Sequence, residues 1–282
     1  HAVLLGDVLA APLRDLAAYQ QAGGGQALRT ALASGSAAVI EQIAASGLRG
    51  RGGAGFAAAK KWAAVAAAGG AQKYVVANAD EGDPGGFSDK VLLEQNPFLL
   101  IEAMLIAGIA VGASKGYIYL RREYPAAGAI LRQAIQQAQA AGWLGASVLG
   151  SSHDFELQLV VGHGSYLCGE ETAMLNAIEG QRPEVRIRPP QISVHGLFGL
   201  PTLVNNVETL CNVPAIIGNG VAWYQGLALP GSEDHGTKLM GFSGKVNNPG
   251  LWELPFGITA RELFEEAALT ATKVHYHSTQ PW

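Results

Sequence analysis

The strongest chemical signal lies in residues 47–62, GLRGRGGAGFAAAKKW, which combine closely spaced glycines with cations. Three of the glycines fit the pattern G-x-G-x-x-G: Gly50, Gly52 and Gly55. A glycine loop before a helix lets backbone N–H groups approach a phosphate, and the helix N-terminus adds partial positive charge. Arg51, Lys60 and Lys61 add formal charge. Taken alone, the segment fits an anion site and a flexible turn with solvated cations equally well.

The same glycines also match the turn that binds a nicotinamide dinucleotide in a Rossmann fold. That turn needs a strand before the glycines, a helix after them, and an acid about 20 residues on, at the end of the next strand. The helix AAAKKWAAVAAAG and the strand KYVVANAD, which ends at Asp80, meet two conditions. The preceding AVIEQIAASGL has a helical pattern, and Asp80 follows Gly50 by about 30 residues. The sequence therefore disfavours this turn.

Carboxylates gather directly after that predicted strand, in NADEGDPGGF. Asn78, Asp80, Glu81 and Asp83 fall within six residues, where open α/β sheets bind ligands. A phosphate would be repelled here, whereas an isoalloxazine or a ribitol or ribose chain would find donors and acceptors. The composition also permits a metal, although no neighbouring histidine supports one. An acidic surface loop is the alternative.

A second glycine-rich turn, GHGSYLCGEETAML, places an aromatic ring beside two acids. Tyr166 and Gly169 precede Glu170 and Glu171, which begin a predicted helix. Acids in a first helical turn suit the helix dipole, so capping alone would explain them. The same group also resembles the floor of a binding site.

Two further segments offer hydrogen-bond donors. In PTLVNNVETL, Asn205 and Asn206 suit a helix N-cap, and with Thr209 they offer groups that hold phosphate or hydroxyls. In RIRPP, Arg186 and Arg188 form a candidate anion clamp, although a solvated loop fits as well.

Strands alternating with helices predict an α/β fold, a Rossmann-like parallel sheet with helices on both faces. Expected strands are 73–80, 116–124 and 155–161, and expected helices are 35–47, 57–69, 96–114 and 125–142. Asn96 and Pro97 provide the cap and first residue of the third helix. From about residue 231, a β-hairpin and one helix suggest a small β-grasp-type module. We therefore expect an N-terminal helical segment, a cofactor-binding α/β domain and a truncated β-grasp-like domain, covering residues 1–47, 48–230 and 231–282.

Composition excludes several functional classes. The chain has 282 residues, a net charge of −4 and a pI near 6.0, so no basic field supports nucleic-acid binding. Two cysteines without a C-x-x-C motif favour a reducing compartment. No basic segment precedes an apolar core, and the longest apolar run is interrupted by Glu102, so we expect neither a signal peptide nor a membrane span. No nucleophile elbow, Walker loop or H-E-x-x-H motif is present.

Taken together, GLRGRGGAGF, NADEGDPGGF, GSYLCGEETAMLNAIEG and GLFGLPTLVNNVET resemble the flavoprotein subunit that oxidises NADH in respiratory complex I. They are equally similar to the diaphorase subunits of NAD-linked formate dehydrogenases and bidirectional hydrogenases. The resemblance covers about residues 45–265. The EGDPG form of the acidic loop looks closer to the formate dehydrogenase and hydrogenase branch. The stretch GWLGASVLGS, with the helix start LLIEAM, is more similar to the formate dehydrogenase beta subunit.

The resemblance implies an FMN site next to an NAD(H) site, with hydride exchange between nicotinamide and flavin and single electrons passing to iron–sulfur centres. Tyr166 and Glu171 would lie nearest the reacting rings, Lys61 by the flavin phosphate, and Phe56 on the adenine of NADH. The residues that it implies for cofactor binding are Gly50, Arg51, Gly52, Gly53, Gly55, Phe56, Lys61, Asn78, Asp80, Glu81, Asp83, Tyr166, Gly169, Glu170, Glu171, Arg188, Val204, Asn205, Asn206 and Thr209.

The chain departs from the family in three ways. The family holds a [4Fe-4S] cluster in a helical domain, but the C-x-x-C-x-x-C ligands are absent here, and we expect that domain to be absent too. Ala64 and Gln191 stand where the family carries stacking aromatics, and Arg188 where complex I members carry lysine. Each lost stack would weaken adenine binding by roughly 0.5–1.5 kcal/mol.

These observations predict a diaphorase subunit of a cytoplasmic multi-subunit complex, most simply a formate dehydrogenase or hydrogenase, peripheral to the inner face of a membrane if membrane-associated. The predicted partners are iron–sulfur subunits and a subunit that oxidises the second substrate. The complex I subunit is an alternative, and a non-catalytic assembly subunit is an alternative from another class.

Overall fold

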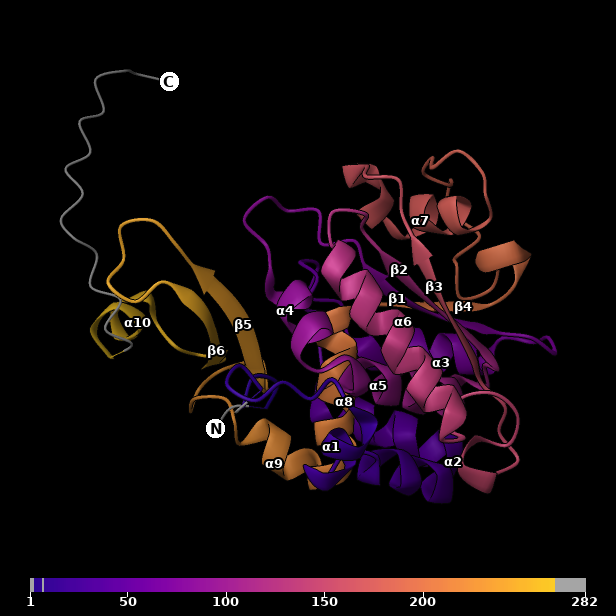
Figure 1. Cartoon of the computed structure of the whole chain (residues 1–282), viewed down its shortest axis with the longest axis horizontal. Coiled ribbons are helices and arrows are strands. Elements are labelled where there is room, and N and C mark those ends of the chain that lie inside the picture. Colours follow the sequence, from indigo (N-terminus) through magenta and orange to yellow (C-terminus); the bar gives the residue numbers. More distant parts are fainter. Residues whose placement is uncertain (1–2, 7, 267–282) are drawn as a thin grey trace.

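The computed structural model describes residues 3–6 and 8–266, in which four parallel strands form one sheet in the order β3-β2-β1-β4 (Figure 1). Their bounds are β1 Tyr74–Ala79, β2 Lys115–Leu120, β3 Glu156–Val161 and β4 Thr202–Asn206. The sheet confirms the predicted α/β class. The end of the predicted third domain, residues 267–282, lies outside the described residues.

Helices cover the two faces of the sheet unequally (Figure 1). One face packs in a large core with α2 (Gln26–Ser46), α3 (Ala58–Ala67), α5 (Pro97–Val111), α6 (Pro125–Ala140) and α8 (Val207–Asn219). The other face packs in a smaller core with α7 (Glu171–Ile178) and the 3-10 helix η3 (Leu197–Gly199). The shorter helices are α1 (Leu16–Gln21), α4 (Ser88–Gln95), α9 (Val221–Gln225), η1 (Val148–Gly150) and η2 (Tyr166–Gly169).

Helix α5 is buried almost throughout, and its one acid has a structural role. The carboxylate of Glu102 accepts hydrogen bonds from the backbone N–H groups of Gly25 and Leu28, both at 2.8 Å, and from the Tyr19 hydroxyl at 2.6 Å. These N–H groups belong to the first turn of α2, which has no intrahelical acceptors for them. Glu102 therefore fixes α2 against the core.

The chain path leaves a crevice between β1 and β4. From β1 the chain passes to β2 and β3 on one side, and it then returns to place β4 on the other side of β1. Ligands of open α/β sheets bind outside the carboxyl ends of strands at such a switch. The register brings Asn78 opposite Asn206 at this edge.

A two-stranded antiparallel hairpin follows the α/β unit and forms a separate sheet (Figure 1). Its strands are β5 (Thr237–Phe242) and β6 (Gly250–Pro255), and α10 (Ala260–Glu266) comes next. The predicted hairpin and helix are thus confirmed. The β-grasp-type topology and the three domain boundaries stay predictions.

Several predicted boundaries differ from the observed ones. Helix α2 begins at Gln26, nine residues earlier than predicted, and bends at Gly35 (φ 79°, ψ 174°). The acidic loop ends at Phe87 because α4, which the sequence did not predict, begins at Ser88. Asn96 and Pro97 occupy the N-cap and first positions of α5 as predicted, but the Asn96 side chain accepts no capping hydrogen bond.

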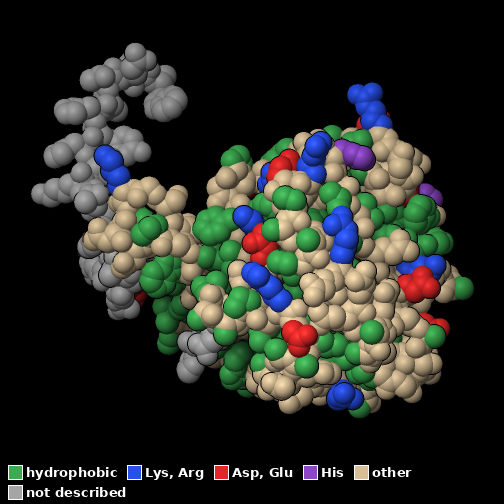
Figure 2. All heavy atoms as spheres, viewed as in Figure 1, with side chains coloured by type: hydrophobic (Ala, Val, Ile, Leu, Met, Phe, Trp, Pro, Cys, Tyr) green, Lys and Arg blue, Asp and Glu red, His purple; other side chains and the backbone are tan. Residues whose placement is uncertain are grey.

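Charged side chains are dispersed over the face shown in Figure 2 and form no continuous basic surface there. Within residues 3–6 and 8–266, no single helix has the length and apolarity needed to cross a bilayer. One pair, α4 and α5, meets those two criteria jointly, but it is bent by 97°.

Candidate functional site

Three adjoining cavities open at the carboxyl edge of the sheet. We call them the acidic cavity, the central cavity and the outer cavity, with volumes of about 600, 320 and 400 Å³. The acidic and central cavities share the residues Gly52, Asn78, Gly169, Glu170 and Asn206. The central and outer cavities share Ala54, Phe56, Lys61, Glu171, Arg188 and Val204. The three therefore form one continuous cleft.

Every residue expected to bind cofactor lines this cleft. The acidic cavity is lined by Arg51, Gly52, Gly53, Asn78, Asp80, Glu81, Asp83, Tyr166, Gly169, Glu170 and Asn206. The central cavity adds Gly50, Gly55, Phe56, Lys61, Glu171, Arg188, Val204, Asn205 and Thr209. The structure thus brings together segments up to about 160 residues apart, while the role of each residue stays a prediction.

The glycine loop forms an open wall of the cleft between α2 and α3. It follows a helix, which removes the dinucleotide-binding turn as an explanation. Gly53 and Gly55 have φ of 117° and 61°, and a Cβ at either position would meet no atom within 4 Å. Both backbones are therefore accessible, and side chains are disfavoured there by the left-handed conformation. The Arg51 N–H donates to Thr209 Oγ1 at 2.8 Å, which ties the loop to α8.

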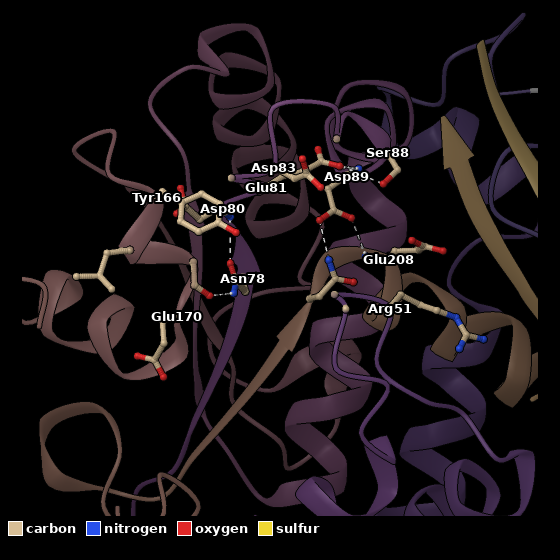
Figure 3. Close-up of a pocket in the computed structure, with 17 residues that line it drawn as sticks. Arg51, Asn78, Asp80, Glu81, Asp83, Ser88, Asp89, Tyr166, Glu170 and Glu208 are labelled. Atoms are coloured by element: carbon tan, nitrogen blue, oxygen red, sulfur yellow. Dashed lines mark hydrogen bonds between the residues drawn. The ribbon is translucent and has the colours of Figure 1, made fainter. Parts of the chain in front are cut away.

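Arg51 lines the acidic cavity, but its guanidinium is turned away from Asp80 and Tyr166 (Figure 3). The group is held by the Tyr224 hydroxyl and the His235 carbonyl, both at 2.9 Å. In this structure the guanidinium is thus engaged within the protein, and a contribution of its charge to an anion site stays a prediction. Lys61 lines both the central and the outer cavity, so its ammonium group is the one from this segment that is placed for that role.

In the acidic loop, Glu81 is occupied by contacts within the protein. Its carboxylate accepts hydrogen bonds from the Ser88 hydroxyl at 3.1 Å and from the N–H groups of Asp89 and Lys90 at 3.2 Å. It also accepts one from the Tyr124 hydroxyl at 3.0 Å. Glu81 therefore caps α4, and its carboxylate fixes the shape of the loop.

Asp80 differs from Glu81 because its carboxylate is incompletely satisfied. Its Oδ2 is buried beside the acidic cavity and accepts no hydrogen bond from any described residue. Burial raises the pKa of Asp80 to about 6, Arg121 acts in the opposite direction, and Glu123 adds to the rise. A ligand N–H at this cavity would satisfy the buried oxygen, so the residue fits a hydrogen-bonding heterocycle.

The two asparagines at the end of β4 have different free groups. Asn206 caps α8, since its Oδ1 accepts from Thr209 N at 3.0 Å, and its Nδ2 donates to Asp89 Oδ2 at 2.7 Å. Asn205 accepts from Trp62 Nε1 at 3.0 Å, and its Nδ2 has no partner among the described residues. Asn205 thus offers a donor to the central cavity, whereas Asn206 shapes the wall.

A chain of ion pairs crosses the boundary between the central and outer cavities. Glu171 lies between Lys61 at 2.8 Å and Arg188 at 3.1 Å, and Arg188 also binds Glu170 at 2.5 Å. Burial opposes ionisation of Glu170, but hydrogen bonds from Thr172 and the charge of Arg188 lower its pKa below the usual value. Glu170 also caps α7, as capping alone predicted.

Two buried acids that no sequence motif indicated also line the acidic cavity. Asp89 and Glu208 are 4% and 1% exposed. Burial raises the pKa of both carboxyls, and in Glu208 the ion pair with Lys238 opposes the rise. Nothing in the local sequence marks their burial, which depends on tertiary packing.

The outer cavity contains both positions at which a stacking aromatic was missing. Ala64 and Gln191 line it together with Phe56, which is 50% exposed. Of the three cavities, Lys60 lines only the outer one. Within the described part of the chain, no group of three or more His, Cys, Asp or Glu side chains is placed to hold a metal.

Comparisons with known proteins agree with this geometry. Residues 43–215 match the family model described as the Nuo51 FMN-binding domain. An NADH-quinone oxidoreductase subunit of Escherichia coli (strain K12) is 52% identical over 231 residues, covering 82% of this chain and 52% of that protein. The NADP-reducing hydrogenase subunit HndC of Solidesulfovibrio fructosivorans is 46% identical over 227 residues, covering 80% of this chain and 46% of that protein.

Solved structures show the same fold. A chain of an NAD+-reducing [NiFe]-hydrogenase in the H2-reduced state superposes with a TM-score of 0.80 at 37% identity, covering 95% of this chain and 43% of that one. The chain spans about half the length of the curated relatives it matches.

Proposed function

The chain belongs to the family of the Nuo51 FMN-binding domain, and we propose that it binds FMN and NAD(H) in the cleft and exchanges hydride between them. In this role it is the diaphorase part of a multi-subunit oxidoreductase. FMN supplies a ring that accepts a hydride and releases electrons singly.

One observation carries the proposal: the cleft is electrostatically polar along its length. Its acidic cavity is lined by carboxylates, Asp80, Glu81, Asp83, Asp89, Glu170 and Glu208, while the guanidinium of Arg51 is turned away. The outer cavity is lined by Lys60, Lys61 and Arg188 against Glu171 alone. An elongated ligand with an uncharged ring at one end and a phosphate at the other fits this polarity in one orientation only.

The free groups support the same orientation. Asp80 Oδ2 offers an acceptor to a ring N–H in the acidic cavity. Lys61 and the Nδ2 of Asn205 offer donors to a phosphate in the central cavity, beside the accessible backbone of Gly55. The residues present thus fit FMN.

The remaining side chains orient the two rings and exclude water. Tyr166 is 77% exposed over the acidic cavity and lies against Gly82. Its ring can cover a stacked pair of heterocycles. Glu171, held between Lys61 and Arg188, has a fixed position where the central cavity meets the outer one. No side chain has to transfer a proton in the hydride step.

Anaerobic spectroscopy tests the proposal directly. The purified chain, reconstituted with FMN, should show flavin absorbance near stoichiometric occupancy, and NADH should bleach it. A chain that stays colourless after reconstitution would favour the non-catalytic assembly role. The variants Glu171→Gln and Asp80→Asn should slow NADH-dependent reduction of an artificial acceptor, and wild-type rates in both would remove them from the site.

The partners follow from the same proposal. We propose that electrons pass to iron–sulfur centres in other subunits and that another subunit oxidises the second substrate. Complex I and a hydrogenase are each represented among the relatives of this chain, whereas a formate dehydrogenase rests on the sequence resemblance alone. Metal analysis of the native complex distinguishes them. We expect molybdenum or tungsten in a formate dehydrogenase, nickel in a nickel-iron hydrogenase, and none of these metals in complex I.

A further inference from the structure

Arg51 lines the acidic cavity, but its guanidinium makes its contacts outside that cavity. The residue is 7% exposed, and its guanidinium donates to Tyr224 in α9 and to the carbonyl of His235, which precedes β5. The guanidinium also lies 4.4 Å from the ring centroid of Phe256, directly after β6. A buried charge requires such partners, so these contacts next to the β5–β6 hairpin fix the position of the guanidinium.

The backbone of the same residue faces the cofactor cleft. Arg51 N–H donates to Thr209 Oγ1, and its neighbours Gly50 and Gly52 line the central cavity. The guanidinium contacts and the backbone contact to Thr209 belong to the same residue. A shift of the guanidinium would therefore move the glycine loop.

A second buried charge connects the same two regions. Glu208 lines the acidic cavity, and its carboxylate binds Lys238 Nζ and, at 2.8 Å, the N–H of Leu239 in β5. The hairpin is thus attached to the cleft at two points, one on the glycine loop and one on α8.

We propose that Arg51 is a positioning residue that couples docking of residues 237–256 to the shape of the glycine loop, so that FMN binding and hairpin docking stabilise each other. The inference rests on the proposed FMN site. Coupling of this kind is reciprocal: if the docked hairpin favours FMN, then FMN favours the docked hairpin by the same factor.

FMN affinity tests the first direction. Tyr224→Phe and Phe256→Leu remove partners of the guanidinium, and neither residue lines the cleft. Tyr224→Phe should weaken FMN binding to the full chain by about tenfold, since a hydrogen bond to a charged group contributes about that much. Phe256→Leu removes a cation–π contact and should weaken FMN binding by roughly three- to tenfold. Arg51→Lys, which cannot reproduce the planar contacts, should weaken it further.

Arg49→Gln is the matched control. Arg49 lies in the same loop and pairs with Asp234 at 2.9 Å, but its side chain is 54% exposed. This variant should keep FMN affinity within about twofold, because exposed ion pairs contribute little.

Hydrogen exchange tests the second direction, which a purely structural role would not affect. FMN should slow amide exchange in residues 237–242 and 250–255 of the wild type, and this protection should be smaller in Tyr224→Phe. Unchanged exchange on FMN addition, with wild-type affinity in Tyr224→Phe and Phe256→Leu, would overturn the positioning role. If Arg51→Lys does not fold, these two variants decide. A wild-type chain that binds no FMN would instead reject the proposed function.

Discussion

The acidic cavity and the central cavity lie side by side, yet their polar groups are used differently. Most carboxylates of the acidic cavity are hydrogen-bonded within the protein, as Glu81 is to α4 and Asp89 to Asn206. The central cavity keeps donors available, including Asn205 Nδ2 and the open backbone of the glycine loop. One end therefore repels phosphate by its field, and the other binds phosphate through individual donors.

This difference distinguishes the effect of net charge on FMN binding from the effect of individual hydrogen bonds. In the acidic cavity, a change that preserves shape and removes charge should have a modest effect on FMN affinity. In the central cavity, reversing one charge should abolish most of the affinity. The variants below test that contrast, beginning with the largest expected effect.

Lys61→Glu should weaken FMN binding by at least about a hundredfold, because it removes a charged donor and places a second carboxylate beside Glu171. Fluorescence quenching of free FMN on titration measures the dissociation constant. Lys60→Glu is the contrast: it introduces the same charge one residue earlier but reaches only the outer cavity. Equal losses in both variants would mean that the net field, rather than Lys61, holds the phosphate.

Gly82→Ala should slow NADH-dependent flavin reduction by about tenfold while FMN stays bound. A Cβ at this position would lie 2.8 Å from the Tyr166 ring, so the ring must move away from its place over the acidic cavity. Gly85→Ala is the control in the same loop, because a Cβ there meets no atom within 4 Å. Stopped-flow absorbance measures both rates, and equal rates would exclude a role for the position of Tyr166.

The sequence predicted β1, β2 and β3 and the longer helices between them because strong periodicity and turn residues mark them, but it did not predict β4. The parallel sheet around β1 and most of the helices of the larger core followed from these patterns. Helix α4 escaped prediction because its cap comes from Glu81, seven residues before Ser88, and no local cap residue marks its start. Distant capping of this kind has no sequence signature.

The site was predictable as a set of residues but not as a set of contacts. The segments that resemble the family all line the cleft, whereas the turned-away guanidinium of Arg51 and the closed hydrogen bonds of Asn206 depend on distant partners. Asp89 and Glu208 were missed for the same reason, since only the tertiary fold buries these two acids. Side-chain direction is set by tertiary packing, which spacing along the chain does not encode.

Asp80→Asn should stabilise the FMN-free protein at pH 7.5 by about 1 kcal/mol, allowing for its partial exposure. Burial raises the pKa of Asp80 to about 6 from 3.8, so the folded state holds the proton more tightly than the unfolded chain. The corresponding stability is fully present below about pH 4 and is lost as the pH rises through 6. In Asp80→Asn the free energy of unfolding should not show this decrease as the pH rises. Urea unfolding at pH 4 and 7.5 measures it, and parallel pH profiles for both proteins would contradict the assignment.

Gln191→Phe should produce the smallest change, a two- to tenfold gain in affinity for NADH. The outer cavity holds about 400 Å³ and already contains the half-exposed ring of Phe56, so a second aromatic face would add one stacking contact on the adenine, worth roughly 0.5–1.5 kcal/mol. The KM for NADH in an artificial-acceptor assay reports the gain, with Ala64→Phe as a second variant in the same cavity. FMN affinity should not change in either, because neither residue lines the central cavity. A gain in FMN binding instead would mean that the outer cavity belongs to the flavin, and the division between the two ends of the cleft would have to be redrawn.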